Sequence, residues 1–109
     1  MVNRMDKINE LVKHELSREI LLRFPNEIVS VTAVDVSRDL SYAKVWISAL
    51  ENVEDVVKRC RAEASELTRV LARKLVIKKV PKLSFYADNT PDRVEKIEHL
   101  IDEIHQDEA

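Results

Sequence analysis

The chain contains no glycine, and this absence excludes several common kinds of binding and catalytic site. A P-loop, a dinucleotide-binding turn and a nucleophile elbow all need glycine, either for a positive φ angle or for close approach of the backbone. None of these sites is present in its usual form. Where the backbone must become left-handed, Asn26 and Asn89 are the expected substitutes, because asparagine tolerates that conformation better than most residues.

Cysteine and long apolar runs are also scarce. The single cysteine, Cys60, rules out an intrachain disulfide and suits a cytoplasmic protein. No apolar run approaches the ~18 residues that a membrane span needs, and the first residues lack the apolar centre of a signal peptide. The histidines His14, His99 and His105 have no metal-ligand spacing with Cys60, so we expect no metal and no cofactor. An enzymatic function therefore has little support.

The remaining composition, with 45% hydrophobic residues in 109, predicts a single domain over residues 1–109 with one modest core. Hydrophobic spacing predicts helices over 3–24 and 52–76 and strands over 28–36, 42–50 and 82–87. A last helix should start at Thr90-Pro91. Its inward-facing residues should be Val94, Ile97, Leu100, Ile101 and Ile104. Three strands cannot bury both faces, so we expect an α+β fold with the helices on one face of a small mixed sheet.

Local features refine these elements. Alternation in the first strand slips near Thr32-Ala33, which predicts a β-bulge. Asn52 is expected to cap the long helix with its side chain. On the first helix, Asp6, Glu10, Glu15 and Glu19 alternate with cations in the manner of a solvated face.

The net charge of −2 conceals a polarised distribution. Residues 58–82 hold nine cations and two acids, whereas residues 88–109 hold eight acids and two cations. A concentrated basic segment in a nearly neutral chain favours local contact with nucleic acid. The alternative is that the basic segment forms only a solvated helix face.

The basic residues of the long helix follow one face. Its apolar residues recur in steps of three and four and predict a buried side. Opposite them lies a set that we call the outer stripe: Lys58, Ala62, Ser65, Arg69 and Arg73. Small residues there would let a polyanion come close while the cations hold it. The candidate RNA-binding residues are therefore Lys58, Ala62, Ala64, Ser65, Arg69, Arg73, Lys74, Lys78 and Lys79, with Arg38 in the hairpin loop, and Arg4 and Lys7 as further candidates.

Several stretches together resemble the ribosome-binding factor A family of bacterial small-subunit assembly factors. They are residues 34–48 (VDVSRDLSYAKVWIS), Glu63-Ala64-Ser65 with Arg69 one turn on, residues 80–85 (VPKLSF), and Asp88-Asn89-Thr90. The resemblance covers nearly the whole chain in the right order. It implies a KH-like domain of the helix-first type, α-β-β-α(kinked)-β-α. It also implies a monomeric, non-enzymatic protein that binds the free small (30S) ribosomal subunit and its 16S rRNA, assists late rRNA maturation in the cold, and is released with help from an assembly GTPase.

The chain departs from the family pattern inside the long helix. The family kinks this helix at an Ala-x-Gly sequence, but Glu66 stands here where glycine is expected. Glutamate is a good helix former, so the resemblance leaves open whether this helix breaks. If it does, a Ser65 hydroxyl bond to the preceding turn is one means. By the helical count, Glu66 lies off the centre of the outer stripe.

Two other functions also fit the sequence. A generic KH-like binder of single-stranded RNA would need stacking platforms, for which Trp46, Tyr42 and Tyr86 are the candidates. More often such a tryptophan only covers the surface of a sheet. A protein-interaction module without RNA would use the acidic last helix or the open face of the sheet.

Overall fold

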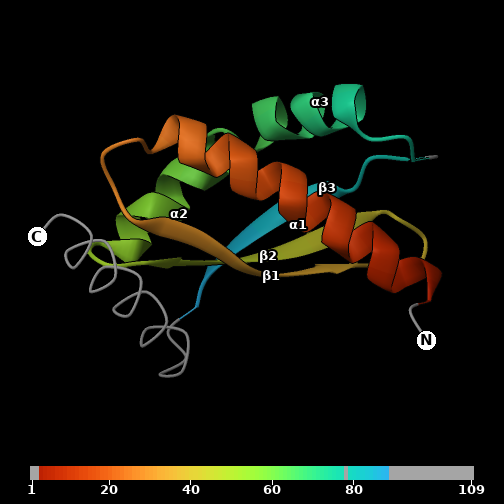
Figure 1. The fold of residues 1–109 in the computed structure, drawn as a ribbon, viewed down its shortest axis with the longest axis horizontal. Coiled ribbons are helices and arrows are strands. Elements are labelled where there is room, and N and C mark those ends of the chain that lie inside the picture. Colours follow the sequence, from red (N-terminus) through yellow and green to blue (C-terminus); the bar gives the residue numbers. More distant parts are fainter. Residues whose placement is uncertain (1–2, 78, 89–109) are drawn as a thin grey trace, which may run out of the picture.

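The computed structural model describes residues 3–77 and 79–88, which form a helix-first α+β domain (Figure 1). The predicted last helix, Asn89 and Lys78 lie outside the described residues. In chain order the elements are α1 (Arg4–Arg23), β1 (Val29–Val36), β2 (Tyr42–Ala49), α2 (Val53–Ala62), α3 (Ala64–Lys74) and β3 (Lys82–Ala87). Within these limits the predicted order of helices and strands is confirmed.

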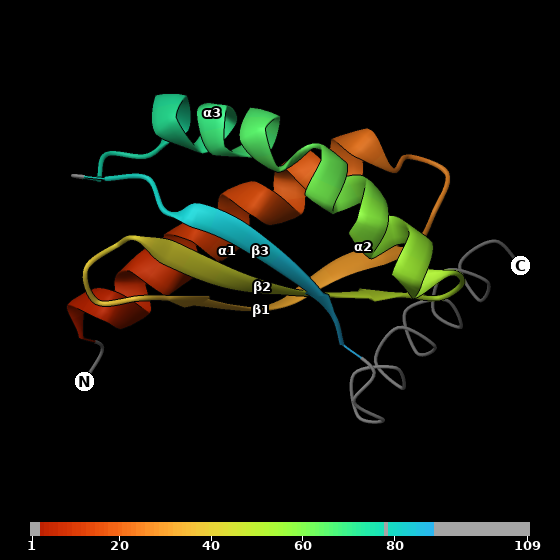
Figure 2. The same ribbon diagram turned by 180° about the vertical axis from the view of Figure 1, so that it is seen from behind.

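The three strands form one mixed sheet in the order β1-β2-β3. β1 and β2 are antiparallel, whereas β3 joins β2 in parallel, because the crossover through α2 and α3 returns the chain in the same direction. The β1–β2 register shifts between Val31 and Ala33, which confirms the predicted bulge. Figures 1 and 2 show α1, α2 and α3 on the same face of the sheet, as expected.

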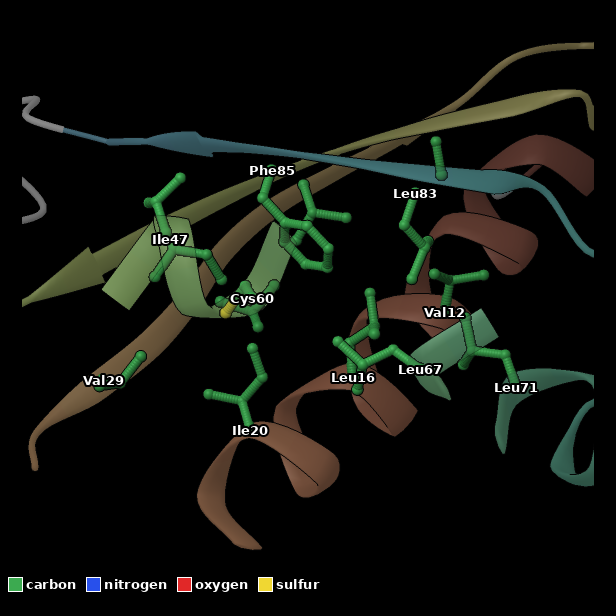
Figure 3. Packing of buried hydrophobic residues seen from close by; sticks show 14 of the residues in the cluster. Val12, Leu16, Ile20, Val29, Ile47, Cys60, Leu67, Leu71, Leu83 and Phe85 are labelled. Atoms are coloured by element: carbon green, nitrogen blue, oxygen red, sulfur yellow. The ribbon is translucent and has the colours of Figure 1, made fainter. Parts of the chain in front are cut away.

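One hydrophobic core lies between the helices and the sheet (Figure 3). Alternation along β2 turns Ala43, Val45 and Ile47 inward, and all three are fully buried. The other elements contribute Val12, Leu16 and Ile20 from α1, Val56, Val57 and Cys60 from α2, Leu67 and Leu71 from α3, and Leu83 and Phe85 from β3. Burial raises the pKa of the Cys60 thiol to about 11, so this cysteine is an inert core residue.

The long helix predicted over 52–76 is interrupted at Glu63 and ends at Lys74, two residues before the expected end. Glu63 has φ −101° and ψ 10°, and its amide N–H still donates to the carbonyls of Arg59 and Cys60. α2 packs on β2 and β3, whereas α3 packs on α1 and β3. A straight helix could not reach both sets of partners, so tertiary packing breaks it although the local residues favour a helix.

The kink implied by the family resemblance is therefore present, beside the Ala64-Ser65 pair. The hydroxyl that bonds backward to the helix here belongs to Thr68, which donates to the Ala64 carbonyl at 2.8 Å. The suggested Ser65 bond does not occur among the described residues.

The backbone is left-handed at two residues that differ from the asparagines expected to adopt this conformation. Among the described residues only Leu40, with φ 60°, and Asn52, with φ 55°, have positive φ, so the expectation for Asn26 was wrong. Asn52 does stand at the start of α2, but its side chain makes no capping bond. The cap supplied by side chains is found instead on α1, where Asn3 and Asp6 form a reciprocal capping box.

Candidate nucleic-acid interface

The outer stripe is exposed but does not run along a single helix. Lys58 and Ala62 lie on α2, whereas Ser65, Arg69 and Arg73 lie on α3 beyond the break. Figures 1 and 2 show that the two helices follow different axes. The α3 part therefore forms a compact surface of its own, in which the side chains of Arg69 and Arg73 are 69% and 66% exposed.

Glu66, which the helical count puts off the centre of the outer stripe, lies within reach of both arginines. Its carboxylate is 3.4 Å from Arg69 Nη1 and 4.0 Å from Arg73 Nη2. Because exposed ion pairs of this kind contribute only about 0–1 kcal/mol, neither arginine is locked in place. The three side chains nevertheless sum to a charge of about +1, which is less than the sequence suggested.

Several other cations of the basic segment bind the protein itself. Arg61 donates two hydrogen bonds, at 2.8 and 3.2 Å, to the Phe85 carbonyl. Arg59 stacks over the Phe24 ring at 4.4 Å and pairs with Glu27 at 2.8 Å, and the Glu27 hydrogen bond raises the pKa of Arg59. The nine cations counted in the sequence therefore overstate the charge available to a partner.

Lys74, predicted to bind RNA, belongs to an ionic cluster between α1 and α3. Its Nζ lies 3.4 Å from Glu19 Oε1, and Arg23 Nη1 lies 2.6 Å from Glu19 Oε2. Burial alone raises the pKa of Glu19, but the hydrogen bonds from Arg23 and Lys74 outweigh it and hold that pKa below its ordinary value. Glu19 was expected on a solvated face, yet its side chain is only 9% exposed. That expectation was wrong because α3 covers this turn of α1.

Ala64 differs from the other small residues of the predicted site. It is half-buried and packs against the core, whereas Ala62 and Ser65 are exposed. Close approach of a ligand can therefore involve Ala62 and Ser65, while Ala64 serves the packing at the start of α3.

Arg38 and Lys79 are distant in the sequence but line the same hollow, at the end of the molecule where α1 begins. Together with Arg4 they border a hollow of about 500 Å³, whose lining is completed by Met5, Ile8, Asp39 and Leu40. The sequence identified each of these cations as a candidate, but no sequence pattern indicated that they lie close together. Only the proximity of the β1–β2 loop to the α3–β3 connection brings them together.

The aromatic residues proposed as stacking platforms lie on β2 and β3, with Trp46 and Tyr86 in register. Their rings are 5.9 Å apart between centroids and tilted by 33°, and Trp46 is half-buried. Trp46 therefore covers the sheet through its contact with Tyr86. Tyr42 is 62% exposed.

Other kinds of site find no support in the part of the chain that the structure describes. Within residues 3–77 and 79–88, no three or more histidine, cysteine or acidic side chains gather as a metal site would require. The helices in those ranges are too short or too polar to cross a membrane.

Comparison with known proteins points to one family. The model of the ribosome-binding factor A family matches residues 4–101. Ribosome-binding factor A of Methylobacillus flagellatus is 36% identical over 107 residues, covering 93% of this chain and 84% of that protein. The same factor from Opitutus terrae is 32% identical over 109 residues, covering 95% of this chain and 89% of that protein.

Solved structures agree on the fold. The crystal structure of ribosome-binding factor A from Thermus thermophilus matches with a TM-score of 0.69 at 24% identity, covering 76% of this chain and 93% of that one. A homology model of the Thermus thermophilus factor, fitted into a cryo-EM map of its complex with the 30S subunit, matches with a TM-score of 0.63 at 26% identity, covering 72% of this chain and 88% of that one. The predicted helix-first KH-like fold is confirmed. The chain is a member of the ribosome-binding factor A family.

Proposed function

We propose that this protein is a ribosome assembly factor of the cytoplasm that binds the free 30S subunit through its 16S rRNA. It assists late maturation of that RNA, including at low temperature, and an assembly GTPase promotes its release. It acts as a monomer, without a cofactor and without a catalytic step of its own. Family membership supports this proposal, and so does the complex of the Thermus thermophilus relative with the 30S subunit.

The observation that carries RNA contact is the exposed pair of arginines on α3, beside the exposed Ser65. Guanidinium groups bind phosphate in a bidentate manner, and contacts to phosphate fix position more than they read base sequence. We therefore assign phosphate binding to Arg69 and Arg73 first, with Lys58 and Lys79 as exposed cations nearby in the chain. The exposed residues Ala62 and Ser65 belong to this proposed surface, whereas Lys74 contributes less because it pairs with Glu19. Lys78, which lies outside the described residues, is proposed from the sequence alone.

Replacing both Arg69 and Arg73 with alanine should weaken binding to purified 30S subunits about tenfold at low salt. The logarithm of affinity should also fall less steeply with the logarithm of salt concentration. Two lost phosphate contacts should flatten that slope by about 1.5–2. Co-sedimentation over a series of potassium chloride concentrations measures both quantities. In cold-shifted cells, the variant should also move out of the free-subunit fractions of a sucrose gradient.

Arg18→Ala is the matched control, since Arg18 is exposed on α1 and has no ion pair among the described residues. It should leave affinity and slope nearly unchanged. An unchanged affinity and slope in the double variant would remove the α3 surface from the mechanism.

Glu66 should restrain binding, because its carboxylate competes with phosphate for the two arginines. Glu66→Gln keeps the shape of the side chain and removes its charge. We expect the variant to bind 30S subunits about threefold more tightly at low salt, with the gain lost as salt screens the charge. Glu10→Gln, on the exposed side of α1, is the control. Weaker binding by Glu66→Gln would show that Glu66 itself contacts the partner.

A further inference from the structure

The hollow at the start of α1 is formed by three segments that are distant in the sequence. Figures 1 and 2 show the first turn of α1, the β1–β2 loop and the α3–β3 connection at the same end of the molecule. The hollow measures about 500 Å³. We call it the terminal hollow; its lining residues are Arg4, Met5, Ile8, Arg38, Asp39, Leu40 and Lys79. A space of this size suits one small group and excludes a double helix.

The lining divides into an apolar floor and a cationic rim. Ile8 and Leu40 are 7% and 8% exposed and Met5 is half-buried, so these three side chains form the floor. The exposed residues Arg4, Arg38 and Lys79 form the rim. Among the described residues none of these three cations has an ion pair.

Asp39, the one acidic residue of the lining, accepts hydrogen bonds from other residues of the β1–β2 loop. Its Oδ1 accepts hydrogen bonds from the Ser37 hydroxyl at 2.8 Å and the Ser41 amide at 3.1 Å. These bonds, that from Ser37 first, lower the pKa of Asp39, so it remains charged at neutral pH and holds the turn. Lys79 Nζ donates to Ser41 Oγ at 3.2 Å, which ties the α3–β3 connection to the same turn. The hollow is thus held in shape, and its lining, with three cations and Asp39, keeps a net charge of about +2.

The backbone of Leu40 supports a role for this floor. Leu40 is left-handed, with φ 60°, a conformation that glycine or asparagine adopts at much lower cost. A strained backbone of this kind tends to occur where function requires a particular side chain. Here the left-handed turn places an apolar side chain in the lining of the terminal hollow, which Arg38 and Lys79 also line.

We infer that the terminal hollow binds one unpaired nucleotide of an RNA chain. The nucleobase lies on the apolar floor of Met5, Ile8 and Leu40, and the backbone phosphates are neutralised by Arg4, Arg38 and Lys79. Extruded bases are what proteins recognise in folded RNA, because paired bases are inaccessible in its deep groove. This inference rests on the proposed function, since it takes the ligand to be RNA. It adds a site that is separate from Arg69 and Arg73, the arginines of α3 to which we assign phosphate binding.

The test uses the full-length chain and two short RNA hairpins that differ by a single bulged 2-aminopurine in the stem. Affinity is measured by titration, and the fluorescence of the 2-aminopurine reports on its surroundings. We expect the bulged RNA to bind about five- to tenfold more tightly than the paired RNA, with a change in fluorescence on binding. The variant Arg4→Ala/Arg38→Ala, which changes two lining cations that are not assigned to the α3 surface, should lose this preference and retain most of its affinity for the paired RNA.

The α3 variant separates this inference from the proposed function. Arg69→Ala/Arg73→Ala should weaken binding to both hairpins equally and keep the preference for the bulge. Loss of 30S binding in that variant with the preference intact supports both assignments. Equal binding of the two hairpins to the unaltered protein, or binding to neither, overturns the inference, whereas co-sedimentation with 30S subunits judges the proposed function independently.

Two further measurements keep the outcome clear. Leu40→Gly suits the left-handed backbone and removes the floor, so it should reduce the preference without changing the salt dependence for the paired RNA. Adenosine monophosphate serves as the free-nucleotide probe. If it binds as tightly as the bulged RNA, the hollow is a site for a free nucleotide and the RNA assignment is wrong.

Discussion

Replacing Leu16 with alanine should destabilise the fold by about 3–5 kcal/mol. Leu16 is fully buried, and it extends from α1 toward Leu67 of α3 (Figure 3). The substitution removes apolar contacts and leaves a cavity that the surrounding packed side chains fill only in part. Since a domain of this size is stable by about 5–15 kcal/mol, the loss should be a large share of the total. Urea unfolding followed by circular dichroism measures it.

Leu22→Ala provides a control of the same chemistry on the same helix. Leu22 is 73% exposed, so its removal should change the free energy of unfolding by less than about 0.5 kcal/mol. Equal losses in the two variants would mean that the spacing of apolar residues on α1 does not define its buried face. The slope of the unfolding free energy against urea should be the same in both proteins.

The elements of this fold follow largely from apolar spacing. On α1 the residues Ile8, Val12, Leu16 and Ile20 recur at helical intervals, and all four are buried. The slip of alternation at Thr32-Ala33 also became a bulge in the sheet. These features depend on neighbours in the sequence and on one buried face, which a periodic pattern expresses directly.

The break at Glu63 could not be derived in the same way. Glutamate favours helix, and the apolar stripe continues through the break from Cys60 to Leu67, both buried. α2 ends here because α3 packs on α1 while α2 packs on β2, and one straight helix cannot make both contacts. A requirement set by distant elements leaves no local pattern, and only the family resemblance pointed to it.

The candidate site also combines features that follow from local sequence patterns with features that depend on distant parts of the chain. Exposure of Arg69 and Arg73 followed from helical spacing, whereas the ion pairs that Glu66 forms with both are seen only in the structure. The convergence of Arg4, Arg38 and Lys79 depends on how the first turn of α1, the β1–β2 loop and the α3–β3 connection pack together, and no local sequence pattern records this packing. Side-chain charge is visible in a sequence, but its neutralisation by the protein's own groups is visible only in the structure.

The ionic cluster at Glu19 holds α3 on α1 and contributes to the stability of the fold. Glu19→Gln should cost about 2–3 kcal/mol at pH 7, because it leaves Arg23 and Lys74 without the carboxylate between α1 and α3. In a domain of this size such a loss lowers Tm by about 8–12 °C. Arg23 retains Glu63 at 3.6 Å, which limits the damage. Glu10→Gln, at an exposed position of the same helix, should leave Tm nearly unchanged.

The dependence of this effect on pH distinguishes the ion pairs from simple packing. The pKa of Glu19 lies below its ordinary value of 4.5 in the folded protein, so the folded state binds this proton less readily than the unfolded chain does. The contribution of Glu19 is therefore complete above the pKa of the unfolded chain and is lost as pH falls through the lower folded pKa. Thermal unfolding of the unaltered protein and of Glu19→Gln should differ fully at pH 7 and progressively less below about pH 4.5. A difference that stays constant from pH 7 to pH 3 would mean that the glutamate acts through its shape and hydrogen bonds, and that its charge contributes nothing to holding α3 on α1.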